Sequence, residues 1–310
     1  MISVNERAYS IFEDLLEFEE DYGVKSYRLN NGATVIDCGV AVRGSYDAGM
    51  MFIQISMGGL SGVNIQLEDI RDVQTPFVYV YTDFPDLSCL GCQMAGWKIE
   101  LNDFKGLASG PARALALKPK EIFDYLDYED DAEYAVVTIE SDRIPDERVV
   151  EYIAKECDVE ASEVYIAVTS IRSLVGVIQI SGRVIENALF RAKSMGFDVR
   201  KIRNAMGKCP VAPIMEDEMR TMAAANDSIC YYGSVYLTVD GFDSVLENIT
   251  FDRTKYYGKT FYEIVKDVGD IYKLDPDVFS PARVLINDVN GGFYSYGTLN
   301  PEILLKSYGL

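Results

Sequence analysis

The 310-residue sequence contains no histidine, and this absence removes several kinds of active site. Ser-His-Asp and Cys-His nucleophile systems are excluded, and so is every metal site that needs an imidazole ligand. Acid-base chemistry near neutral pH must therefore come from a Glu, Asp, Lys, Cys or Tyr side chain whose pKa is shifted by its surroundings.

Cysteine is scarce, and six cysteines in 310 residues are too few for a disulfide scaffold. Cys89 and Cys92 form the single Cys-x-x-Cys pair. A zinc site would need two more soft ligands at a suitable spacing, and a thioredoxin-like redox centre would place the pair at a helix start after a strand. Both alternatives stay open, but the composition favours buried, reduced cysteines, and we expect no metal.

Long apolar runs and basic clusters are also absent. No stretch approaches 18 uninterrupted apolar residues, so no membrane span is expected, and the first residues lack the basic and apolar regions of a signal peptide. The net charge of -20 disfavours binding to nucleic acid or to an anionic membrane surface. These features predict a cytoplasmic protein.

The residues that are present predict a mixed α/β fold. The hydrophobic and charged fractions, 48% and 25%, are typical of a globular protein, and 310 residues suffice for one large or two ordinary domains. Asn31-Gly32 and residues 290–292 are hairpin signals, and Ser3 with Glu6 predicts a capped helix. Strands and helices do not alternate regularly, so a plain doubly wound sheet is not expected.

Hydrophobic patterns predict individual elements, although no domain boundary is evident in them. We expect a strand at 51–57, a helix at 173–196, a short helix at 199–206 and a strand at 229–239. The acidic run 124–133 is expected to be a solvated loop.

The segment 173–196 carries the most informative polar residues of the chain. On one helix, Gln179, Arg183 and Glu186 would lie on the same face, at spacings of i, i+4 and i+7. If that stripe is buried, Arg183 and Glu186 need each other, because an isolated buried charge is costly. A carboxylate held beside an arginine in a cleft is a candidate acid-base group. The alternative is an ordinary surface ion pair.

Two further segments contain candidate binding residues. Ser109, Gly110 and Arg113 lie in a loop that leads into a helix, where free backbone N–H groups and the positive end of the dipole suit an anion. A tight turn before a capped helix is the alternative. Asn226 and Asp227 are expected to shape a turn, from which they can line a pocket.

Short blocks of sequence occur in an order and spacing that are specific when taken together. They include Gly44-Ser45-Tyr46-Asp47-Ala48-Gly49, Cys89-Leu90-Gly91-Cys92-Gln93-Met94-Ala95-Gly96-Trp97, Ser109-Gly110-Pro111-Ala112-Arg113-Ala114-Leu115-Ala116, Gln179-Ile180-Ser181-Gly182-Arg183-Val184-Ile185-Glu186, Cys209-Pro210-Val211-Ala212-Pro213, Asn226-Asp227-Ser228, Phe279-Ser280-Pro281-Ala282 and Gly297-Thr298-Leu299-Asn300. With these blocks, which run nearly from end to end, the chain resembles the methenyltetrahydromethanopterin cyclohydrolases, archaeal-type enzymes of one-carbon metabolism and methanogenesis. The resemblance implies two closely associated α/β domains with an active pocket between them, in a subunit of a homotrimer.

The resemblance also implies a reaction and the residues that perform it. The family interconverts N5,N10-methenyltetrahydromethanopterin and N5-formyltetrahydromethanopterin, and its amidinium substrate is already electrophilic, so the reaction needs no metal, redox cofactor or covalent nucleophile. By position, Glu186 matches the family's catalytic glutamate, and Arg183 matches the arginine beside it. The family's pterin substrate carries a phosphate-containing tail. The implied substrate-binding residues are Gln179, Ser109, Gly110, Arg113, Asn226 and Asp227.

One turn departs from the family pattern. Before the catalytic helix the family usually has an Ala-Pro-Thr-Ala-Ser-like turn, whereas residues 169–173 here read Thr169-Ser170-Ile171-Arg172-Ser173. A bulky Ile171 and a charged Arg172 near the catalytic pair predict an altered substrate fit. The alternative to an active cyclohydrolase is therefore a non-catalytic or altered-specificity pterin-binding paralogue of the same fold.

Overall fold

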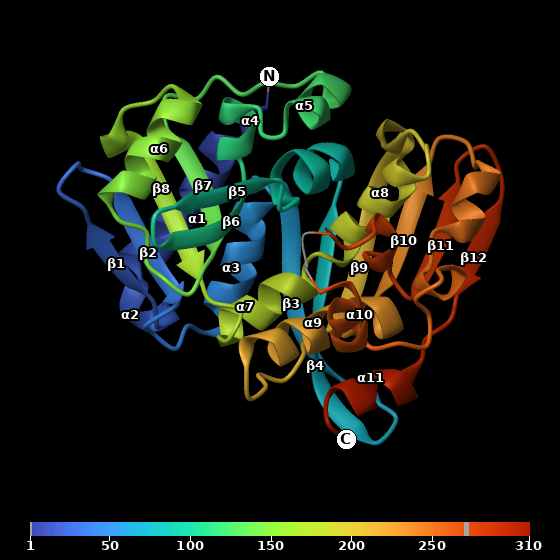
Figure 1. The fold of residues 1–310 in the computed structure, drawn as a ribbon. Helices are drawn as coiled ribbons and strands as arrows, with labels where there is room; N and C mark the ends of the chain where they lie inside the picture. The colour runs from blue at the N-terminus through green and yellow to red at the C-terminus, as the bar shows by residue number, and fades with distance from the viewer. Residues whose placement is uncertain (1, 270–272) are drawn as a thin grey trace. The chain divides into compact units, whose positions relative to one another are not determined.

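The computed structural model describes residues 2–269 and 273–310, and the chain forms two compact units (Figure 1). Unit 1 consists of Met1–Gly62 and Leu87–Gln179, and unit 2 consists of Val63–Asp86 and Ile180–Leu310. Each unit contains a six-stranded mixed sheet with helices, so the predicted mixed α/β fold is confirmed. Because each unit combines two stretches of the chain, no single linker separates them.

The helices and strands have the following bounds. In unit 1 they are α1 (Val4–Glu17), α2 (Glu19–Tyr22), β1 (Lys25–Arg28), β2 (Thr34–Gly39), α3 (Tyr46–Ser56), β5 (Trp97–Leu101), β6 (Phe104–Ser109), α4 (Ala112–Ala116), α5 (Lys120–Leu126), β7 (Ala135–Glu140), α6 (Glu147–Cys157), η2 (Ala161–Glu163) and β8 (Val164–Thr169). In unit 2 they are β4 (Val73–Thr82), α8 (Val184–Ser194), η3 (Val199–Lys201), β9 (Ile202–Pro210), α9 (Glu218–Tyr232), β10 (Ser234–Val239), η4 (Ser244–Asn248), η5 (Phe251–Arg253), α10 (Phe261–Val268), η7 (Pro276–Val278), β11 (Arg283–Asp288), β12 (Phe293–Gly297) and α11 (Pro301–Ser307). The chain passes between the units within β3 (Ser61–Ile70), the π-helix η1 (Asp86–Gln93) and α7 (Leu174–Ser181). Among the residues that the structure describes, no helix is both long and apolar enough to cross a membrane.

The sheet of unit 1, sheet A, has the strand order β1-β2-β8-β7-β6-β5. Its strands β2, β8 and β7 are parallel, whereas β1, β6 and β5 pair antiparallel with their neighbours. Successive residues of a strand point to opposite faces. Val35 and Val137 therefore belong to an apolar cluster with α4 and α6, and Ile36 and Val136 belong to another with α1 and α3. Helices thus cover both faces of sheet A.

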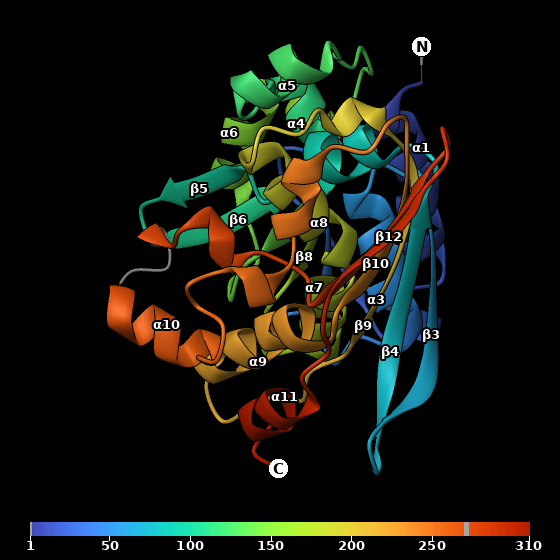
Figure 2. The same ribbon diagram turned by 90° about the vertical axis from the view of Figure 1, so that its right-hand side faces the viewer.

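The sheet of unit 2, sheet B, has the strand order β12-β11-β10-β9-β4-β3. Strands β10 and β11 are parallel, whereas β9 pairs antiparallel with both β10 and β4, and β12 pairs antiparallel with β11. Helices α8 and α9 pack against β9, and α10 and α11 pack against α9. Figure 2 shows α8, α9 and α10 on one side of this sheet.

The structure corrects the predictions for three apolar segments, in whole or in part. The segment 51–57 lies mostly in α3, whose N-terminus is capped by Ser45. In the segment 199–206, only Val199–Lys201 is helical, as the 3-10 helix η3, and strand β9 begins at Ile202. In such apolar segments the helix and strand patterns differ little, and burial against neighbouring elements decides between them. The predicted strand at 229–239 begins only at Ser234, because the preceding residues complete α9.

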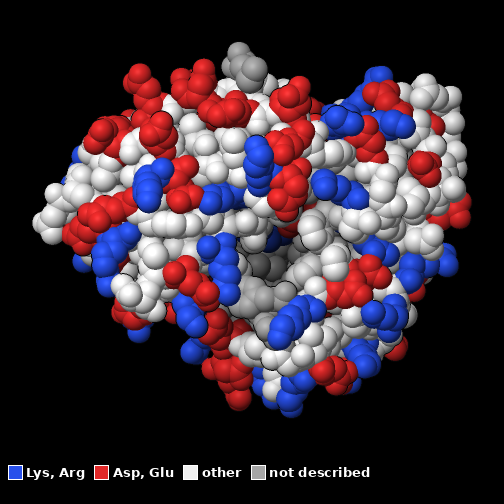
Figure 3. Space-filling model, turned by 45° about the horizontal axis from the view of Figure 1, so that its top comes forward, with Lys and Arg blue, Asp and Glu red and all other residues white. Residues whose placement is uncertain are grey.

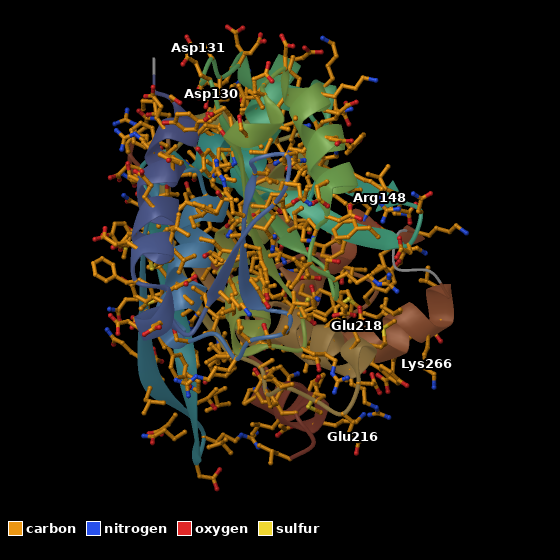
Figure 4. The ribbon with its side chains drawn as sticks, turned by 90° about the vertical axis from the view of Figure 1, so that its left-hand side faces the viewer. Asp130, Asp131, Arg148, Glu216, Glu218 and Lys266 are labelled. Atoms are coloured by element: carbon orange, nitrogen blue, oxygen red, sulfur yellow. The ribbon has the colours of Figure 1, made fainter. Side chains whose placement is uncertain are left out.

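The charge of the acidic run 124–133 predicts a solvated loop, and this prediction is wrong in part. Its first residues belong to α5, and Asp130 is buried. The Asp130 carboxylate accepts hydrogen bonds from the Ser3 hydroxyl at 3.2 Å and from the backbone and side-chain amides of Asn5 at 2.9 and 2.8 Å. This carboxylate, labelled in Figure 4, therefore holds the start of α1.

Candidate active site

The predicted helix at 173–196 is two helices, so this prediction is wrong. The chain turns between α7 and α8 at Gly182 and Arg183, and Arg183 is the N-cap of α8. The Arg183 N–H donates to the carbonyl oxygen three residues before it (2.9 Å), which is the spacing of a tight turn. Glycine has a low helix propensity, which favours a break here. One continuous helical stripe through Gln179, Arg183 and Glu186 therefore does not form.

Arg183 and Glu186 lie at the start of α8, where a negative charge is stabilised. Glu186 is in the first turn, at the positive end of the helix dipole. Arg183 Nη1 lies 4.0 Å from Glu186 Oε2, a distance that suits an ion pair but exceeds a hydrogen bond. The two side chains are 12% and 9% exposed, so the alternative of an ordinary surface ion pair does not describe them. A mostly buried carboxylate beside a cation is a suitable acid-base group.

Two glycines of unit 2 allow the first turn of α8 to pack closely. A Cβ atom on Gly207 of β9 would lie 2.6 Å from Val184 Cγ1 and 3.0 Å from Ile185 Cγ1. A Cβ atom on Gly233 would lie 2.9 Å from Val184 Cγ2. A glycine inside a strand is the sequence signal of such a close approach. For Gly207 that signal is missed because the residues just before it, 199–206, are predicted to be a helix.

Substitution of Gly207 by alanine is expected to displace the first turn of α8 and so to disturb Glu186. We expect turnover to fall by about 10- to 100-fold, since misplacement of a catalytic group by about 1 Å has effects of this size. The free energy of unfolding should also fall by about 1–3 kcal/mol from overpacking. Steady-state kinetics and denaturant unfolding measure the two effects. Asn204→Ala, an exposed position on the same strand, is the control, and unchanged turnover in Gly207→Ala would contradict the positioning role.

In unit 1, Gln179 is bonded to the carboxyl end of a parallel strand of sheet A. Its buried side-chain amide donates to Oε2 of Glu140, the last residue of β7, at 2.6 Å. Near the end of β2, the buried Asp37 carboxylate accepts the backbone N–H groups of residues 39–41 at 2.6–2.9 Å. The carboxyl ends of parallel strands are a common place for ligands in α/β proteins. The sequence gives no signal for Glu140, because a glutamate that ends a strand has no distinctive spacing.

The turn at 169–173 follows β8 at the carboxyl end of that strand. The hydroxyl oxygens of Thr169 and Ser173 are 2.8 Å apart, and the Ser173 hydroxyl donates to the carbonyl oxygen of Ser170 at 2.8 Å. Ile171 is buried and Arg172 is exposed. Of the two residues that depart from the family pattern, one therefore packs in the interior and the other lies at the surface. Their effect on substrate fit stays a prediction.

The segment 109–113 forms a tight turn between strand β6 and the short helix α4. Ser109 is buried at the end of β6, and the Gly110 N–H donates to the carbonyl oxygen of Cys92 at 2.7 Å. The helix that follows, α4, has five residues. These observations agree with the alternative of a tight turn before a short helix, and the binding roles of Ser109 and Gly110 stay predictions.

The Arg113 side chain is surrounded by backbone carbonyl groups in the interior of unit 1. Its side chain is fully buried, and its Nε donates to the carbonyl oxygen of Lys118 at 2.7 Å. Its Nη1 donates to three successive carbonyl oxygens at 2.9–3.1 Å, those of Leu90, Gly91 and Cys92 at the end of η1. The guanidinium thus satisfies carbonyl groups that a helix end leaves without partners. This geometry does not support the prediction that Arg113 binds an anion.

Asn226 and Asp227 lie inside α9, so the prediction that they shape a turn is wrong. The Asn226 side-chain amide donates to the carbonyl oxygen of residue 222 at 2.9 Å. Asp227 is buried, and its carboxylate accepts the backbone N–H of Phe261 at 2.8 Å and the hydroxyl of Ser307 at 2.5 Å. Asp227 therefore joins α9 to the start of α10 and the end of α11. The sequence spacing of these three residues gives no hint of the contact.

Burial raises the pKa of Asp227 from its ordinary value of 3.8 to about 7, and the repulsion of Glu263 adds to the rise. The hydrogen bonds from Ser307 and Phe261 act in the opposite direction. Between about pH 4 and pH 7, the folded chain therefore holds a proton that the unfolded chain has released. Because the folded state binds more protons, the free energy of unfolding must fall as the pH rises through this window.

Asp227→Asn is expected to reduce this loss of stability. For the parent, the contribution of Asp227 should decrease by roughly 3–4 kcal/mol between pH 4 and pH 8, and the neutral asparagine removes it. Denaturant unfolding at a series of pH values measures the difference between the two proteins. Asp217→Asn, at an exposed position before the same helix, is the control. Parallel pH profiles for the parent and Asp227→Asn would contradict the prediction.

All six cysteines are buried, and none forms a disulfide. Cys89 and Cys92 lie within η1. Burial raises the pKa of the Cys92 thiol to about 12, although the charge of Arg113 acts to lower it. A thiol that keeps its proton is a poor nucleophile and a poor metal ligand, which agrees with the interpretation of buried cysteines. Within residues 2–269 and 273–310, no three or more Cys, Asp or Glu side chains are grouped so that they would hold a metal ion.

Comparison with known proteins gives matches over nearly the whole chain. The family model described as "Cyclohydrolase (MCH)" matches residues 3–308. The methenyltetrahydromethanopterin cyclohydrolase of Methanosphaerula palustris is 45% identical over 314 aligned positions, which cover 100% of both chains. The protein of the same name from Methanospirillum hungatei is 45% identical, over 100% of this chain and 99% of its own. The one from Methanothermobacter thermautotrophicus is 42% identical over 100% of both chains.

Proposed function

Because this chain belongs to the family of methenyltetrahydromethanopterin cyclohydrolases, which are hydrolases, we propose that it reversibly hydrolyses N5,N10-methenyltetrahydromethanopterin to N5-formyltetrahydromethanopterin. The observation that carries this proposal is the position of Glu186. Its carboxylate is mostly buried, lies in the first turn of α8 and has Arg183 beside it. In a chain without histidine, such a carboxylate is the natural acid-base group.

The proposed reaction needs one group that first accepts and then returns a proton. Water attacks the bridging carbon of the amidinium cation while Glu186 takes a proton from that water. The neutral intermediate then collapses: the bond from the carbon to N10 breaks, and N10 takes the proton back from Glu186. The hydroxyl proton leaves as the formyl C=O on N5 forms, so one proton is released in the hydrolytic direction. A single carboxylate can serve both steps.

Arg183 is proposed to stabilise the ionised carboxylate without consuming its hydrogen-bonding capacity. An arginine side chain keeps its positive charge throughout the accessible pH range. At 4.0 Å from the carboxylate oxygen, it favours the charged, proton-accepting form of Glu186 through charge alone. The substrate carbon is already electrophilic, so the proposal includes no metal and no cofactor. We expect full activity after exhaustive chelation, and recovery of activity only on addition of a divalent metal would contradict this.

The substrate-binding assignments differ in how well the structure supports them. The polar carboxyl ends of the strands of sheet A, with Gln179 and Glu140, form the part of unit 1 that best suits the pterin. Ser109, Gly110 and Asn226 remain proposed contacts, whereas the side chains of Arg113 and Asp227 are engaged in bonds within their own units. We further propose that the chain functions in the cytoplasm as a homotrimer.

The alternative function is a pterin-binding paralogue with altered specificity or without turnover. The observation that favours it is the turn 169–173, which departs from the family pattern and follows β8 directly. A paralogue without turnover would bind the methenyl compound and leave its absorbance unchanged.

Loss of the methenyl absorbance on mixing the chelated protein with N5,N10-methenyltetrahydromethanopterin tests the proposed function. We expect a catalytic loss of absorbance, reversed under conditions that favour ring closure. Repeating the measurement with other methenyltetrahydropterins compares their kcat/KM values and so reports specificity. Stoichiometric binding without any loss of absorbance would contradict the proposal and support the alternative.

A further inference from the structure

Unit 2 contains a pocket that the proposed reaction does not use. It lies among α9, α10 and α11, where α10 and α11 both pack against α9 (Figure 2). The pocket, which we call the three-helix pocket, has a volume of about 150 Å³, several times the space that one water molecule needs. Its walls include Arg220 of α9, Thr260, Tyr262 and Glu263 at the start of α10, and Lys306 and Ser307 at the end of α11.

The two cations of the pocket wall form only loose ion pairs. Arg220 Nε lies 3.5 Å from Asp217 Oδ2, and Lys306 Nζ lies 3.9 Å from Glu263 Oε1. Charge-assisted hydrogen bonds between such groups are typically about 2.7–2.9 Å long. Arg220 and Lys306 therefore keep the capacity to donate hydrogen bonds to a further anion.

The start of α10 adds to the positive potential of the pocket. The Arg220 guanidinium lies 4.9 Å from the centre of the Tyr262 ring, and Nζ of Lys266, labelled in Figure 4, lies 5.2 Å from it. An aromatic ring attracts cations without neutralising their charge. Because the first turn of α10 lines the pocket, the positive end of its helix dipole lies beside the pocket as well.

The charged side chains that line the pocket, or that contact its charged and aromatic side chains, have a net positive charge. They are the cations Arg220, Lys266 and Lys306 and the carboxylates Asp217 and Glu263. Glu263 Oε2 already accepts a backbone N–H at the start of α10, at 2.8 Å. The whole chain, in contrast, has a net charge of -20, and Asp and Glu side chains are prominent on the face that Figure 3 shows. The three-helix pocket thus offers an anion a local attraction that the net charge does not.

The buried Asp227 carboxyl lies directly behind the wall of the pocket. Its Oδ2 accepts the hydroxyl of Ser307, a wall residue, at 2.5 Å, and its Oδ1 accepts the N–H of Phe261, the neighbour of the wall residue Thr260, at 2.8 Å. An ionised Asp227 would repel an anion in the pocket, whereas a protonated Asp227 would not. Because burial raises the pKa of Asp227 to about 7, this carboxyl holds its proton below neutral pH and releases it above.

The other ionisable groups that face Asp227 keep one charge state near neutral pH. Glu263 of α10 stays ionised, because the hydrogen bond from the backbone at the start of that helix lowers its pKa. Burial raises the pKa of Cys230 and Tyr231 on α9 and of Tyr308 on α11, so these three groups stay neutral. Among the described residues that face the pocket from behind, Asp227 is therefore the one that couples its charge to pH.

We propose that the three-helix pocket binds a free, doubly charged oxyanion such as sulfate, held by Arg220 and Lys306. The bound ion ties α9, α10 and α11 together and so stabilises the folded state of unit 2. This inference goes beyond the proposed reaction, because the pocket wall includes neither Glu186 nor Arg183.

Equilibrium dialysis with radiolabelled sulfate, at about pH 6 and constant ionic strength, tests this proposal. The parent is expected to bind sulfate saturably at this site, with a Kd of about 1 mM or below. Arg220→Gln with Lys306→Gln should weaken that binding by at least about 10-fold, because it removes two charged donors.

The matched control is Arg200→Gln with Lys255→Gln, which removes the same charge from unit 2. These two cations lie 2.8 and 2.9 Å from their carboxylate partners, so they have no comparable capacity for a further anion, and the control should bind sulfate as the parent does. Circular dichroism establishes that each variant is folded. Absence of saturable binding by the parent, or equal affinities of the two double variants, would overturn the proposal.

The pH dependence of sulfate binding places the ion beside Asp227. Sulfate keeps both charges across this range, so a change in affinity reports the protein. The affinity of the parent should fall by about 10-fold between about pH 6 and pH 9, which corresponds to a change of about one unit in the pKa of Asp227 on binding. Asp227→Asn is neutral at both pH values and should keep the higher affinity at each. Equal affinities of the parent at the two pH values, or the same fall in Asp227→Asn, would contradict binding in this pocket.

The methenyl assay, run without sulfate on the parent sample, keeps this inference separate from the proposed function. Turnover without sulfate binding would overturn the anion site alone. Sulfate binding in the three-helix pocket without turnover would overturn the proposed reaction alone.

Discussion

Glu186→Gln is expected to lose turnover by about 10²–10⁴-fold and to retain substrate binding, as is usual when a general base is removed. Glutamine has nearly the same shape as glutamate, so the first turn of α8 keeps its packing. It cannot accept the proton of the attacking water or return a proton to N10. The measurements are kcat from the methenyl absorbance and the Kd of the substrate from equilibrium binding.

The matched control for this variant is Glu151→Gln, which makes the same chemical change at an exposed position of α6. It should leave both constants unchanged. Turnover of Glu186→Gln within a few-fold of the parent would remove Glu186 from the proposed mechanism, because proton transfer is the only role which that mechanism gives to its carboxylate.

Arg183→Met is expected to lower kcat by about 10²-fold, the effect of removing one charged group that stabilises an active-site anion. Methionine keeps much of the length and apolar volume of the arginine side chain, so the change is mainly one of charge. The mostly buried Glu186 carboxylate then lacks its neighbouring cation and accepts a proton from solvent more readily. The acidic limb of the pH dependence of kcat/KM should therefore move to higher pH.

Arg183→Lys separates charge from packing, because lysine restores the positive charge without the planar guanidinium. It should recover most of the lost turnover and return the acidic limb toward its original position. Arg143→Met, at an exposed arginine, is the control for removal of a charge elsewhere. If Arg183→Met and Arg183→Lys lose turnover equally and neither shifts the pH profile, the role of Arg183 is structural.

Local sequence signals determined several features that the structure shows. Asn31-Gly32 predicts a hairpin, and β1 and β2 pair antiparallel around Gly32, whose φ of +88° suits glycine. Ser3 predicts a helix start, and its hydroxyl accepts the Glu6 N–H at 3.1 Å. These features follow from the sequence because the residues that specify them are close neighbours in the chain.

Segments without such local signals were predicted less well. The apolar run at 51–57 and the segment 199–206 each suit a helix or a strand about equally, since propensities differ by under about 1 kcal/mol per residue. Contacts made far along the chain outweigh differences of this size. In α3 these are contacts with α1 and β7, and in β9 they are the ladders with β4 and β10.

By itself, the sequence determined the family, the mixed α/β class and the likeness of Glu186 and Arg183 to a catalytic pair, because ordered blocks and the absence of histidine are properties of the chain alone. Only the tertiary structure decided which charged residues are buried and what they contact. Arg113 meets the carbonyl groups at the end of η1, and Asp227 joins three helices. The η1 partners of Arg113 and the partners of Asp227 lie between 21 and 80 residues away in the chain, so no local spacing encodes these contacts. Burial and long-range hydrogen bonding arise when distant segments pack together, and for that reason they are read from the fold.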